Sequence, residues 1–158
     1  MLFRSYQSEE VTLAAGVPTI WMGILQALEA EPARWRLTAG MRMVVGGAAA
    51  PQSMIRAFDR FGLRVLHGWG MTETASVGTV NYVKREIKVE GEEAHYALRA
   101  LQGVPLPLVD VRAMTGQGPA PWDGQSMGEL QVRGPWVAWA YHDSGEDTSK
   151  WTDDGWFC

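Results

Sequence analysis

Cysteine is almost absent from this chain, and so is any excess of positive charge. The single cysteine, Cys158, is the last residue, so no internal disulfide can form and nothing in the sequence indicates an oxidising compartment. Fourteen Lys and Arg stand against eighteen Asp and Glu, which gives a net charge of -4 and no basic stripe that could follow a phosphate backbone. We therefore expect a cytoplasmic protein with no nucleic-acid partner.

Metal-binding and hydrolase motifs are also missing. The sequence contains neither Cys-x-x-Cys nor His-Glu-x-x-His, and the histidines His67, His95 and His142 are scattered, so no structural zinc site is expected. Ser76 lacks the leading glycine of the nucleophile elbow found in α/β-hydrolases. Neither a zinc-dependent function nor a serine-hydrolase function is supported.

No stretch of the sequence is typical of a membrane span. The longest uncharged run, Val11 to Leu28, contains Pro18 near its middle and is flanked by glutamates rather than by Lys or Arg. At the N-terminus, Glu9 and Glu10 come before the apolar core of a secretory signal can develop. We expect neither a transmembrane segment nor a signal peptide.

Length and composition favour one ordinary globular domain. With 158 residues, of which 46% are apolar, the chain has room for a single hydrophobic core. Proline suits the first turn of a helix, so Pro18 and the apolar spacing after it predict a helix over about 18–30. Its expected core residues are Ile20, Trp21, Ile24, Leu25 and Leu28.

A strand, a helix and a second strand follow. The valine-rich run 41–45 predicts a short strand buried on both faces, Pro51 begins a helix that stops at Gly62, and 63–66 predicts the second strand. The helix is expected to turn Met54, Ile55 and Phe58 inward and Arg56, Asp59 and Arg60 outward. Such a βαβ unit places its two strands in parallel.

The second half of the chain has a different character. Residues 82–102 carry alternating charges, which predicts a solvated face with a helix over the second half of that range. Alternating apolar and polar residues predict strands at 108–114 and 129–133. The expected fold class is therefore α/β, with a parallel portion over 1–80 and a smaller, mixed, antiparallel-leaning portion over 81–158.

Two glycine-containing segments follow the predicted parallel strands, where open α/β sheets bind their ligands. The first, 46–51, reads Gly-Gly-Ala-Ala-Ala-Pro and lets a flat base or an acyl chain approach the backbone, or is simply a tight connection. The second, 66–74, reads Leu-His-Gly-Trp-Gly-Met-Thr-Glu-Thr. Its indole, hydroxyl and carboxylate suit a purine, a phosphate oxygen and Mg²⁺. The alternative is a buried Trp69 in a glycine-rich loop, with Glu73 capping a turn.

A third region contains two further blocks. Residues 128–135 read Gly-Glu-Leu-Gln-Val-Arg-Gly-Pro, and 151–158 read Trp-Thr-Asp-Asp-Gly-Trp-Phe-Cys. Trp136, Trp139 and Tyr141 lie between them. By themselves these blocks are also consistent with an aromatic packing surface in which Glu129 and Arg133 make structural polar contacts.

In this order and spacing, the three regions resemble the AMP-forming acyl-CoA synthetases of the adenylate-forming ligase superfamily. Gly-aromatic-Gly-x-Thr-Glu is a signature of that superfamily, and the Gly-Gly-Ala-Ala-Ala-Pro, Gly-Glu-Leu-x-x-Arg-Gly and Asp-Gly-Trp-Phe blocks match it in turn. Residues 17–19 also match, and 121–124 together with 132–135 look most like the fatty-acid branch, especially its medium-chain members. Ala140 stands where the family usually has glycine before Tyr141.

The resemblance implies ATP, Mg²⁺, CoA and a fatty acid as ligands. It implies that Trp69 stacks on adenine, that Thr72 donates a hydrogen bond to the α-phosphate and that Glu73 holds Mg²⁺. Thr72 and Glu73 are then the catalytic residues. The residues implied to line the nucleotide and the acyl carboxylate are Gly47, Ala48, Ala49, His67 and Gly68. The implied reaction joins a carboxylate to AMP and then transfers the acyl group to CoA.

Several family blocks have no counterpart in these 158 residues. Neither the upstream phosphate loop nor the Thr-Gly-Asp that follows Asp-Gly-Trp-Phe is found, and the C-terminal catalytic domain is absent. We expect 1–158 to be a single partial AMP-binding (adenylation) domain that is inactive alone, from an enzyme whose full-length form allows a homodimer. The alternatives are adenylation of another acid (aryl, amino or thioether) and a truncated, non-catalytic nucleotide-binding remnant.

Overall fold

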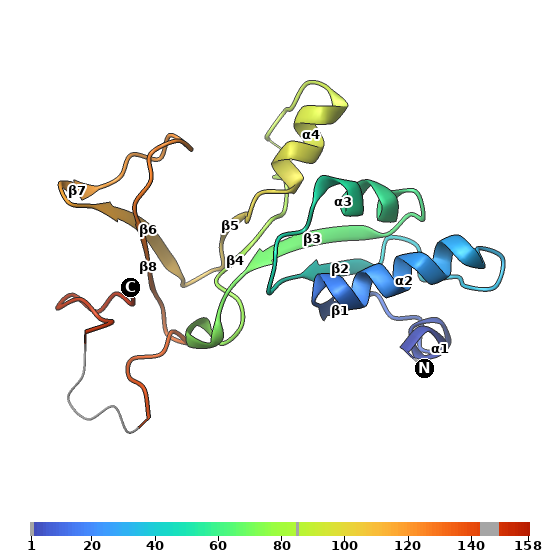
Figure 1. Cartoon of the computed structure of the whole chain (residues 1–158), viewed down its shortest axis with the longest axis horizontal. Coiled ribbons are helices and arrows are strands. Elements are labelled where there is room, and N and C mark those ends of the chain that lie inside the picture. The colour runs from blue at the N-terminus through green and yellow to red at the C-terminus, as the bar shows by residue number, and fades with distance from the viewer. Residues whose placement is uncertain (1, 85, 143–148) are drawn as a thin grey trace. The chain divides into compact units, whose positions relative to one another are not determined.

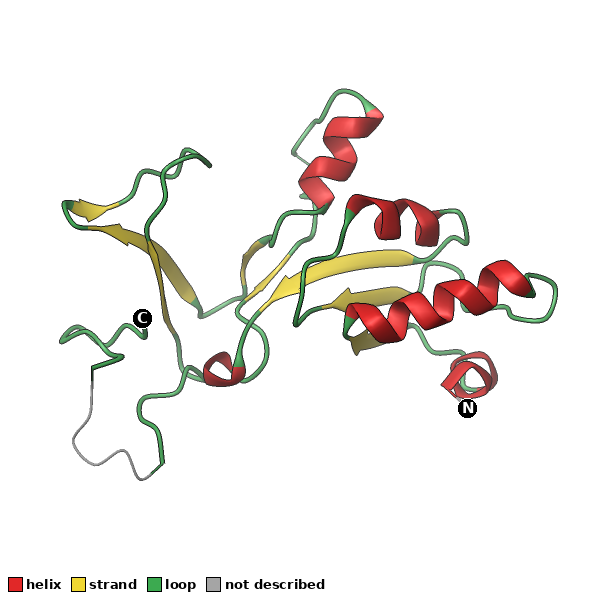
Figure 2. Cartoon of the chain, in the orientation of Figure 1, coloured by secondary structure: helices red, strands yellow, loops and turns green. Residues whose placement is uncertain are grey.

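The computed structural model describes residues 2–84, 86–142 and 149–158, which are drawn in Figures 1 and 2. The chain folds into two compact units. Unit 1 comprises Met1–Trp69 and Thr79–Val104, and unit 2 comprises Gly70–Gly78 and Pro105–Cys158. Each unit is therefore built from two stretches of chain.

Unit 1 is built on a mostly parallel sheet. The strands β1 (Leu13–Gly16), β2 (Arg42–Val45) and β3 (Arg64–Trp69) pair in parallel, and β4 (Thr79–Val80) pairs antiparallel with the end of β3. β5 (Val104–Pro105) completes the order β1-β2-β3-β4-β5. The predicted parallel pairing of β2 and β3 is confirmed, whereas the sequence analysis missed β1.

Four helices accompany this sheet (Figure 2), namely α1 (Leu2–Ser8), α2 (Pro18–Ala30), α3 (Gln52–Asp59) and α4 (Glu92–Arg99). The helices predicted over 18–30, after Pro51 and in the second half of 82–102 are confirmed, and α1 was not predicted. Pro18 occupies the first turn of α2, where its missing N–H costs no hydrogen bond.

The core of unit 1 lies where α2 and α3 cover one face of the sheet. Met43 and Val45 of β2 are fully buried, but Arg42 is exposed and Val44 is half-buried. Side chains alternate between the two faces of a strand, so helices on one face bury every second residue. The prediction that 41–45 is buried on both faces is therefore wrong.

The buried stripe of α2 is also narrower than predicted. Trp21, Ile24, Leu25 and Leu28 are at most 5% exposed, whereas Ile20 is 46% exposed. At about 100° per residue, Ile20 lies roughly 90° from the centre of this stripe, at the edge of the surface that packs on the sheet. The expectation that Ile20 belongs to the core is wrong.

α4 has no buried residue of its own. It is attached to α3 by charged and aromatic contacts. Arg56 of α3 pairs with Glu92 and Glu93 at 2.8 and 2.7 Å, and its guanidinium lies 3.9 Å from the centre of the Tyr96 ring. Asp59 accepts two hydrogen bonds from Arg99 and one, at 2.8 Å, from the Tyr96 hydroxyl. Arg56 and Asp59 thus face away from the core as predicted, but toward α4 rather than toward solvent.

Unit 2 contains a three-stranded antiparallel sheet in the order β7-β6-β8. Its strands are β6 (Asp110–Thr115), β7 (Gly118–Pro119) and β8 (Glu129–Arg133). A short 3-10 helix, η1 (Thr72–Thr74), belongs to the same unit. The strands predicted at 108–114 and 129–133 are confirmed, as is the α/β class with its smaller antiparallel portion.

The uncharged run from Val11 to Leu28 is divided between β1 and α2. Across the described ranges, no helix combines the length and the apolar character needed to cross a membrane.

Candidate functional site

In unit 1, the turn after β2 and the end of β3 lie at the same edge of the sheet. Val45 is the register partner of His67, and a Cβ built on Gly46 would lie 3.5 Å from the carbonyl oxygen of Gly68. The carboxyl ends of parallel strands meet at one sheet edge, so the predicted proximity of these two segments is confirmed. β3 continues through Trp69, because Gly68 and Trp69 pair with β4, so the expected loop begins later than predicted.

The turn between β2 and α3 presents its backbone to solvent. Gly47, Ala48 and Ala49 are exposed, and Ala50 is 2% exposed. Gly47 has φ +79°, a left-handed conformation that glycine adopts without steric cost, and an added Cβ would approach Val17 Cγ1 to 3.3 Å. This backbone is open to a ligand, and the roles predicted for Gly47, Ala48 and Ala49 stay predictions.

His67 is 2% exposed and binds backbone on two sides. Its Nδ1 lies 2.8 Å from the carbonyl oxygen of Ala100, and its Nε2 lies 3.3 Å from the backbone N–H of Ala50. A carbonyl oxygen only accepts, so Nδ1 carries the proton and Nε2 accepts from Ala50. His67 therefore links the glycine-rich turn to the end of α4, and its predicted place beside the nucleotide stays a prediction.

Trp69 occupies the last position of β3. It is half-buried and pairs with Thr79 of β4, while its neighbour Gly68 is buried. The alternative of a buried Trp69 in a glycine-rich loop is therefore wrong, because Trp69 lies in a strand and is only half-buried. The predicted stacking of Trp69 on adenine stays a prediction.

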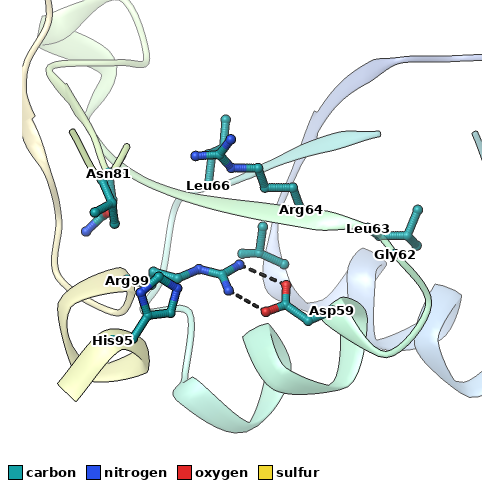
Figure 3. A pocket seen from close by; sticks show the side chains of 10 residues that line it. Asp59, Gly62, Leu63, Arg64, Leu66, Asn81, His95 and Arg99 are labelled. Atoms are coloured by element: carbon teal, nitrogen blue, oxygen red, sulfur yellow. Dashed lines mark hydrogen bonds and ion pairs between the residues drawn. The ribbon is translucent and has the colours of Figure 1, made fainter. Parts of the chain in front are cut away.

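A pocket of about 370 Å³ also lies in unit 1, on the side of β3 that faces α4 (Figure 3). Arg99 and Asp59 point toward one another there and form an ion pair, so their charges are used within the protein. The pocket is lined by Asp59, Gly62, Leu63, Arg64, Val65, Leu66, Asn81, Val83, His95 and Arg99, and none of the predicted site residues is among them.

In unit 2, a compact loop carries Thr72 and Glu73. The hydroxyl of the buried Thr74 accepts a hydrogen bond from Met71 N–H and donates one to the Met71 carbonyl oxygen, both at 3.0 Å. The backbone N–H of Ser76 donates to the same carbonyl oxygen at 3.1 Å. These bonds close the loop around η1 and fix the backbone on which Thr72 and Glu73 stand.

Glu73 is held by two residues that follow it by more than sixty positions. Tyr141 donates its hydroxyl hydrogen to Glu73 Oε1 at 2.6 Å, and Ala138 N–H donates to the Glu73 carbonyl oxygen at 2.7 Å. The hydrogen bond from Tyr141 lowers the pKa of Glu73 below its ordinary value and raises the pKa of Tyr141. The alternative in which Glu73 only caps a turn does not describe these contacts.

Thr72 is exposed, and its hydroxyl has no hydrogen-bond partner among the described residues. It is thus available to an external acceptor. Its role toward the α-phosphate stays a prediction, because no described contact of this side chain tests it.

The carboxylate of Glu73 is suited to bind a hard divalent cation that is also bound by the phosphates of a substrate. Among the residues described, no three His, Cys, Asp or Glu side chains come together to bind a metal ion by themselves. Mg²⁺ is commonly bound by one or two carboxylates together with substrate phosphates, so a single carboxylate is sufficient on the protein side. Tyr141 occupies Oε1, and Oε2 has no hydrogen bond to another described residue.

Arg133 makes the structural contacts considered for the third region. Its guanidinium pairs with Asp110 of β6 at 3.1 Å and lies 4.6 Å from the centre of the Trp156 ring. Glu129 accepts a hydrogen bond from Gln131 within β8 at 3.1 Å. The polar contacts expected of Glu129 and Arg133 are therefore present.

Sequence reasoning missed the two partners of Glu73. The sequence places Tyr141 in an aromatic-rich region and directly after Ala140, and it gives no signal for Ala138. The one available signal was the position of Tyr141 directly after Ala140, in a block that resembles the family. Nothing in that block indicates which distant residue the hydroxyl contacts.

Comparison with known proteins identifies relatives along almost the whole chain. The chain is 42% identical over 158 residues to the long-chain-fatty-acid–CoA ligase of Thermus thermophilus, a match that covers 99% of this chain and 29% of that protein. It is 39% identical over 159 residues to the medium-chain-fatty-acid–CoA ligase of Ectopseudomonas oleovorans, covering 99% and 28%. The chain thus spans less than a third of the length of these curated relatives.

The fold has a counterpart among solved structures. The N-terminal domain of FACL13 from Mycobacterium tuberculosis matches with a TM-score of 0.76 at 22% sequence identity, over 99% of this chain and 36% of that one. At that identity the likeness shows the fold alone. Residues 1–142 match the family model described as AMP-binding enzyme. The predicted resemblance is confirmed, and this chain belongs to the AMP-binding enzyme family.

Proposed function

We propose that this chain forms part of an ATP-dependent fatty acid–CoA ligase. In the first step, a fatty carboxylate attacks the α-phosphate of ATP, which forms an acyl-AMP and releases pyrophosphate. In the second step, the thiolate of CoA attacks the acyl carbon and AMP leaves. The amino acid identity to fatty-acid–CoA ligases along nearly the whole chain supports this reaction.

The observation that carries the proposal is the sheet edge of unit 1. There the exposed backbone of Gly47, Ala48 and Ala49 follows β2, and Gly68 and Trp69 end the neighbouring β3. Residues without bulky side chains let a planar base or an acyl carboxylate approach the main chain, and a half-buried indole offers a stacking face. His67 braces this edge through Ala50.

Thr72 and Glu73 supply the polar groups for the phosphate. The free hydroxyl of Thr72 donates to an α-phosphate oxygen, and Glu73 holds Mg²⁺ through its carboxylate. Mg²⁺, when bound, would offset the negative charge that develops on the phosphate oxygens. Fixed donors and cations of this kind accelerate phosphoryl transfer because they need no reorganisation during the reaction.

The remaining family expectations belong to the same proposal. They are CoA as the second substrate, a cytoplasmic location, a homodimer of the full-length enzyme, and the assignment of 1–158 to a single partial adenylation domain whose catalytic C-terminal domain lies elsewhere. The acid specificity is proposed as fatty, and aryl, amino and thioether acids are the competitors.

The test uses the full gene product that contains this chain. Purified protein is incubated with ATP, Mg²⁺ and CoA together with octanoate, cinnamate or 3-(methylthio)propanoate, and pyrophosphate release is measured. Turnover greatest with octanoate supports the proposal. Preference for another acid would replace fatty acids as the proposed substrate class. The absence of both turnover and ATP binding would indicate a complete loss of function rather than a nucleotide-binding remnant.

Trp69 provides the residue-level test. Trp69→Ala is expected to weaken the binding of a non-hydrolysable ATP analogue by about 1–3 kcal/mol, the range of base–aromatic stacking, and Trp69→Tyr is expected to bind nearly as well as the wild type. Titration calorimetry measures both. Trp122→Ala is the matched control, because Trp122 is 82% exposed in unit 2. Equal losses for the two Trp69 variants would point to packing instead of stacking.

A further inference from the structure

We propose that Tyr141 is a positioning residue for Glu73: its hydroxyl occupies Oε1 and leaves Oε2 for a divalent cation. This inference rests on the proposed function, in which Glu73 holds Mg²⁺. Tyr141 acts through Glu73 and makes no contact of its own with substrate in the argument that follows.

The segment that contains Tyr141 holds both the side chain and the backbone of Glu73. The Tyr141 hydroxyl donates to Oε1 at 2.6 Å, and the backbone N–H of Ala138 donates to the Glu73 carbonyl oxygen at 2.7 Å. A hydrogen bond to an ionised carboxylate is shorter and stronger than one between neutral groups. One of these hydrogen bonds holds the side chain of Glu73 and the other holds its backbone. Together they restrict the rotation of the Glu73 carboxylate.

The ring of Tyr141 is itself held in place. It lies edge-on to Trp151, with ring centres 5.4 Å apart, and edge-on to Phe157 at 6.4 Å. Edge-to-face arrangements of this kind are favourable for aromatic side chains. The hydroxyl is therefore presented to Glu73 from an anchored ring.

The anchors connect back to the same segment and to the sheet of unit 2. The indole N–H of Trp151 donates to the carbonyl oxygen of Ala138 at 2.8 Å. Phe157 exchanges two backbone hydrogen bonds with Val132 of β8, both at 2.9 Å. Glu73 is thus connected to β8 through a series of contacts. Tyr141 and Ala138 bind Glu73, Trp151 and Phe157 hold these two residues in place, and Phe157 pairs with β8.

Packing alone does not require the hydroxyl. Phenylalanine would fill the same space against Trp151 and Phe157, so the oxygen of Tyr141 is explained by the carboxylate it binds. Outer partners that hydrogen-bond a metal ligand fix its orientation, and their loss typically lowers metal affinity by about 10–100-fold. The consequence specific to this arrangement is that cation affinity depends on a hydroxyl that never touches the cation.

The experiment compares Tyr141→Phe with wild type in the full gene product. Mn²⁺ replaces Mg²⁺, a non-hydrolysable ATP analogue is present, and free Mn²⁺ is followed by electron paramagnetic resonance. Tyr141→Phe is expected to weaken Mn²⁺ binding by about 10-fold. Tyr82→Phe, which removes the hydroxyl of an exposed tyrosine in unit 1, is expected to leave it unchanged.

A metal-free measurement accompanies the titration. In wild-type protein the Ala138 amide is bonded to Glu73, so it should exchange slowly with solvent deuterium. Tyr141→Phe is expected to speed that exchange while the thermal unfolding midpoint stays within about 2 °C of wild type. An unchanged exchange rate together with unchanged Mn²⁺ affinity would overturn the inference, and so would tighter Mn²⁺ binding, which would mean that the hydroxyl competes with the cation.

Glu73→Gln separates this inference from the proposed function. If Glu73→Gln leaves Mn²⁺ affinity unchanged, Glu73 is not the metal ligand and both proposals fail at that residue. If Glu73→Gln weakens binding and Tyr141→Phe does not, only the positioning role fails. The expected result is that both weaken binding, and that Tyr141→Phe adds little in the Glu73→Gln background, because the two act through one carboxylate.

Discussion

Gly70→Ala is a substitution for which the structure predicts a large local cost in the loop that carries Thr72 and Glu73. Gly70 opens the loop that carries Thr72 and Glu73, and a Cβ added to it would lie 2.2 Å from the carbonyl oxygen of Ser76 and 2.7 Å from Val77 Cα. These neighbours are backbone atoms, so no side chain can rotate away. The loop itself has to deform.

The size of the deformation sets the expected loss of stability. Ser76 must move by at least about 0.8 Å for the contact to open from 2.2 Å to 3.0 Å, the shortest distance that real Cβ atoms show. That shift strains the hydrogen bonds from Ser76 N–H to Met71 O and from Val77 N–H to Thr74 O, 3.1 and 3.2 Å long. At about 1 kcal/mol each, their loss together with residual overpacking costs about 2–4 kcal/mol.

Urea unfolding of the full gene product, followed by tryptophan fluorescence, measures this cost. Gly116→Ala is the matched control in the same unit, because a Cβ there meets nothing within 4 Å. Gly70→Ala is also expected to weaken Mn²⁺ binding, since Glu73 lies three residues further on in the same loop. A Gly70→Ala variant that unfolds within about 0.5 kcal/mol of the control would refute the steric reasoning.

Two further predictions concern unit 1. His67→Phe removes the acceptor of the Ala50 N–H and is expected to cost about 2–3 kcal/mol in urea unfolding, because a buried donor is left unpaired; an unchanged midpoint would contradict the bridging role. Burial raises the pKa of Asp59, but hydrogen bonds from Arg99 and Tyr96 outweigh it and leave that pKa below its ordinary value. A depressed native pKa stabilises the folded state above the unfolded pKa of about 3.9, so hydrogen-exchange protection of α4 should be constant from about pH 7 to pH 5 and fall as the pH drops below about 4. Full protection at about pH 2 would contradict the role of the ion pair.

Local sequence patterns predicted the elements that carry the candidate site. Pro18 and the apolar period after it predict α2, and the valine run, the proline restart at Pro51 and the second apolar run predict β2, α3 and β3 in parallel. These signals are local, because helix period, strand alternation and proline geometry act within a few residues. They were sufficient to place the glycine-rich turn and Gly68 at one sheet edge.

Other features depend on what each element packs against. Ile20 has the spacing of a core residue and is 46% exposed, and Val44 is apolar yet half-buried. The packing of α2 and α3 on the sheet covers only some of the apolar residues that the sequence pattern assigns to the core. Periodicity states which residues share a face, but the width of the covering surface is a property of the neighbours. That width is decided only when the helices dock on the sheet.

The candidate site divides in the same way. The sequence by itself determined that Trp69, Thr72 and Glu73 share one short segment, and that Gly47 to Ala49 follow a parallel strand, because these are matters of chain order and local geometry. Only the tertiary structure decided that His67 binds the backbone of Ala50 and Ala100, and that Tyr141 holds Glu73. Those contacts join residues up to 68 positions apart, and no local preference of either partner specifies them; they exist because the aromatic packing and strand pairing of each unit bring the partners together.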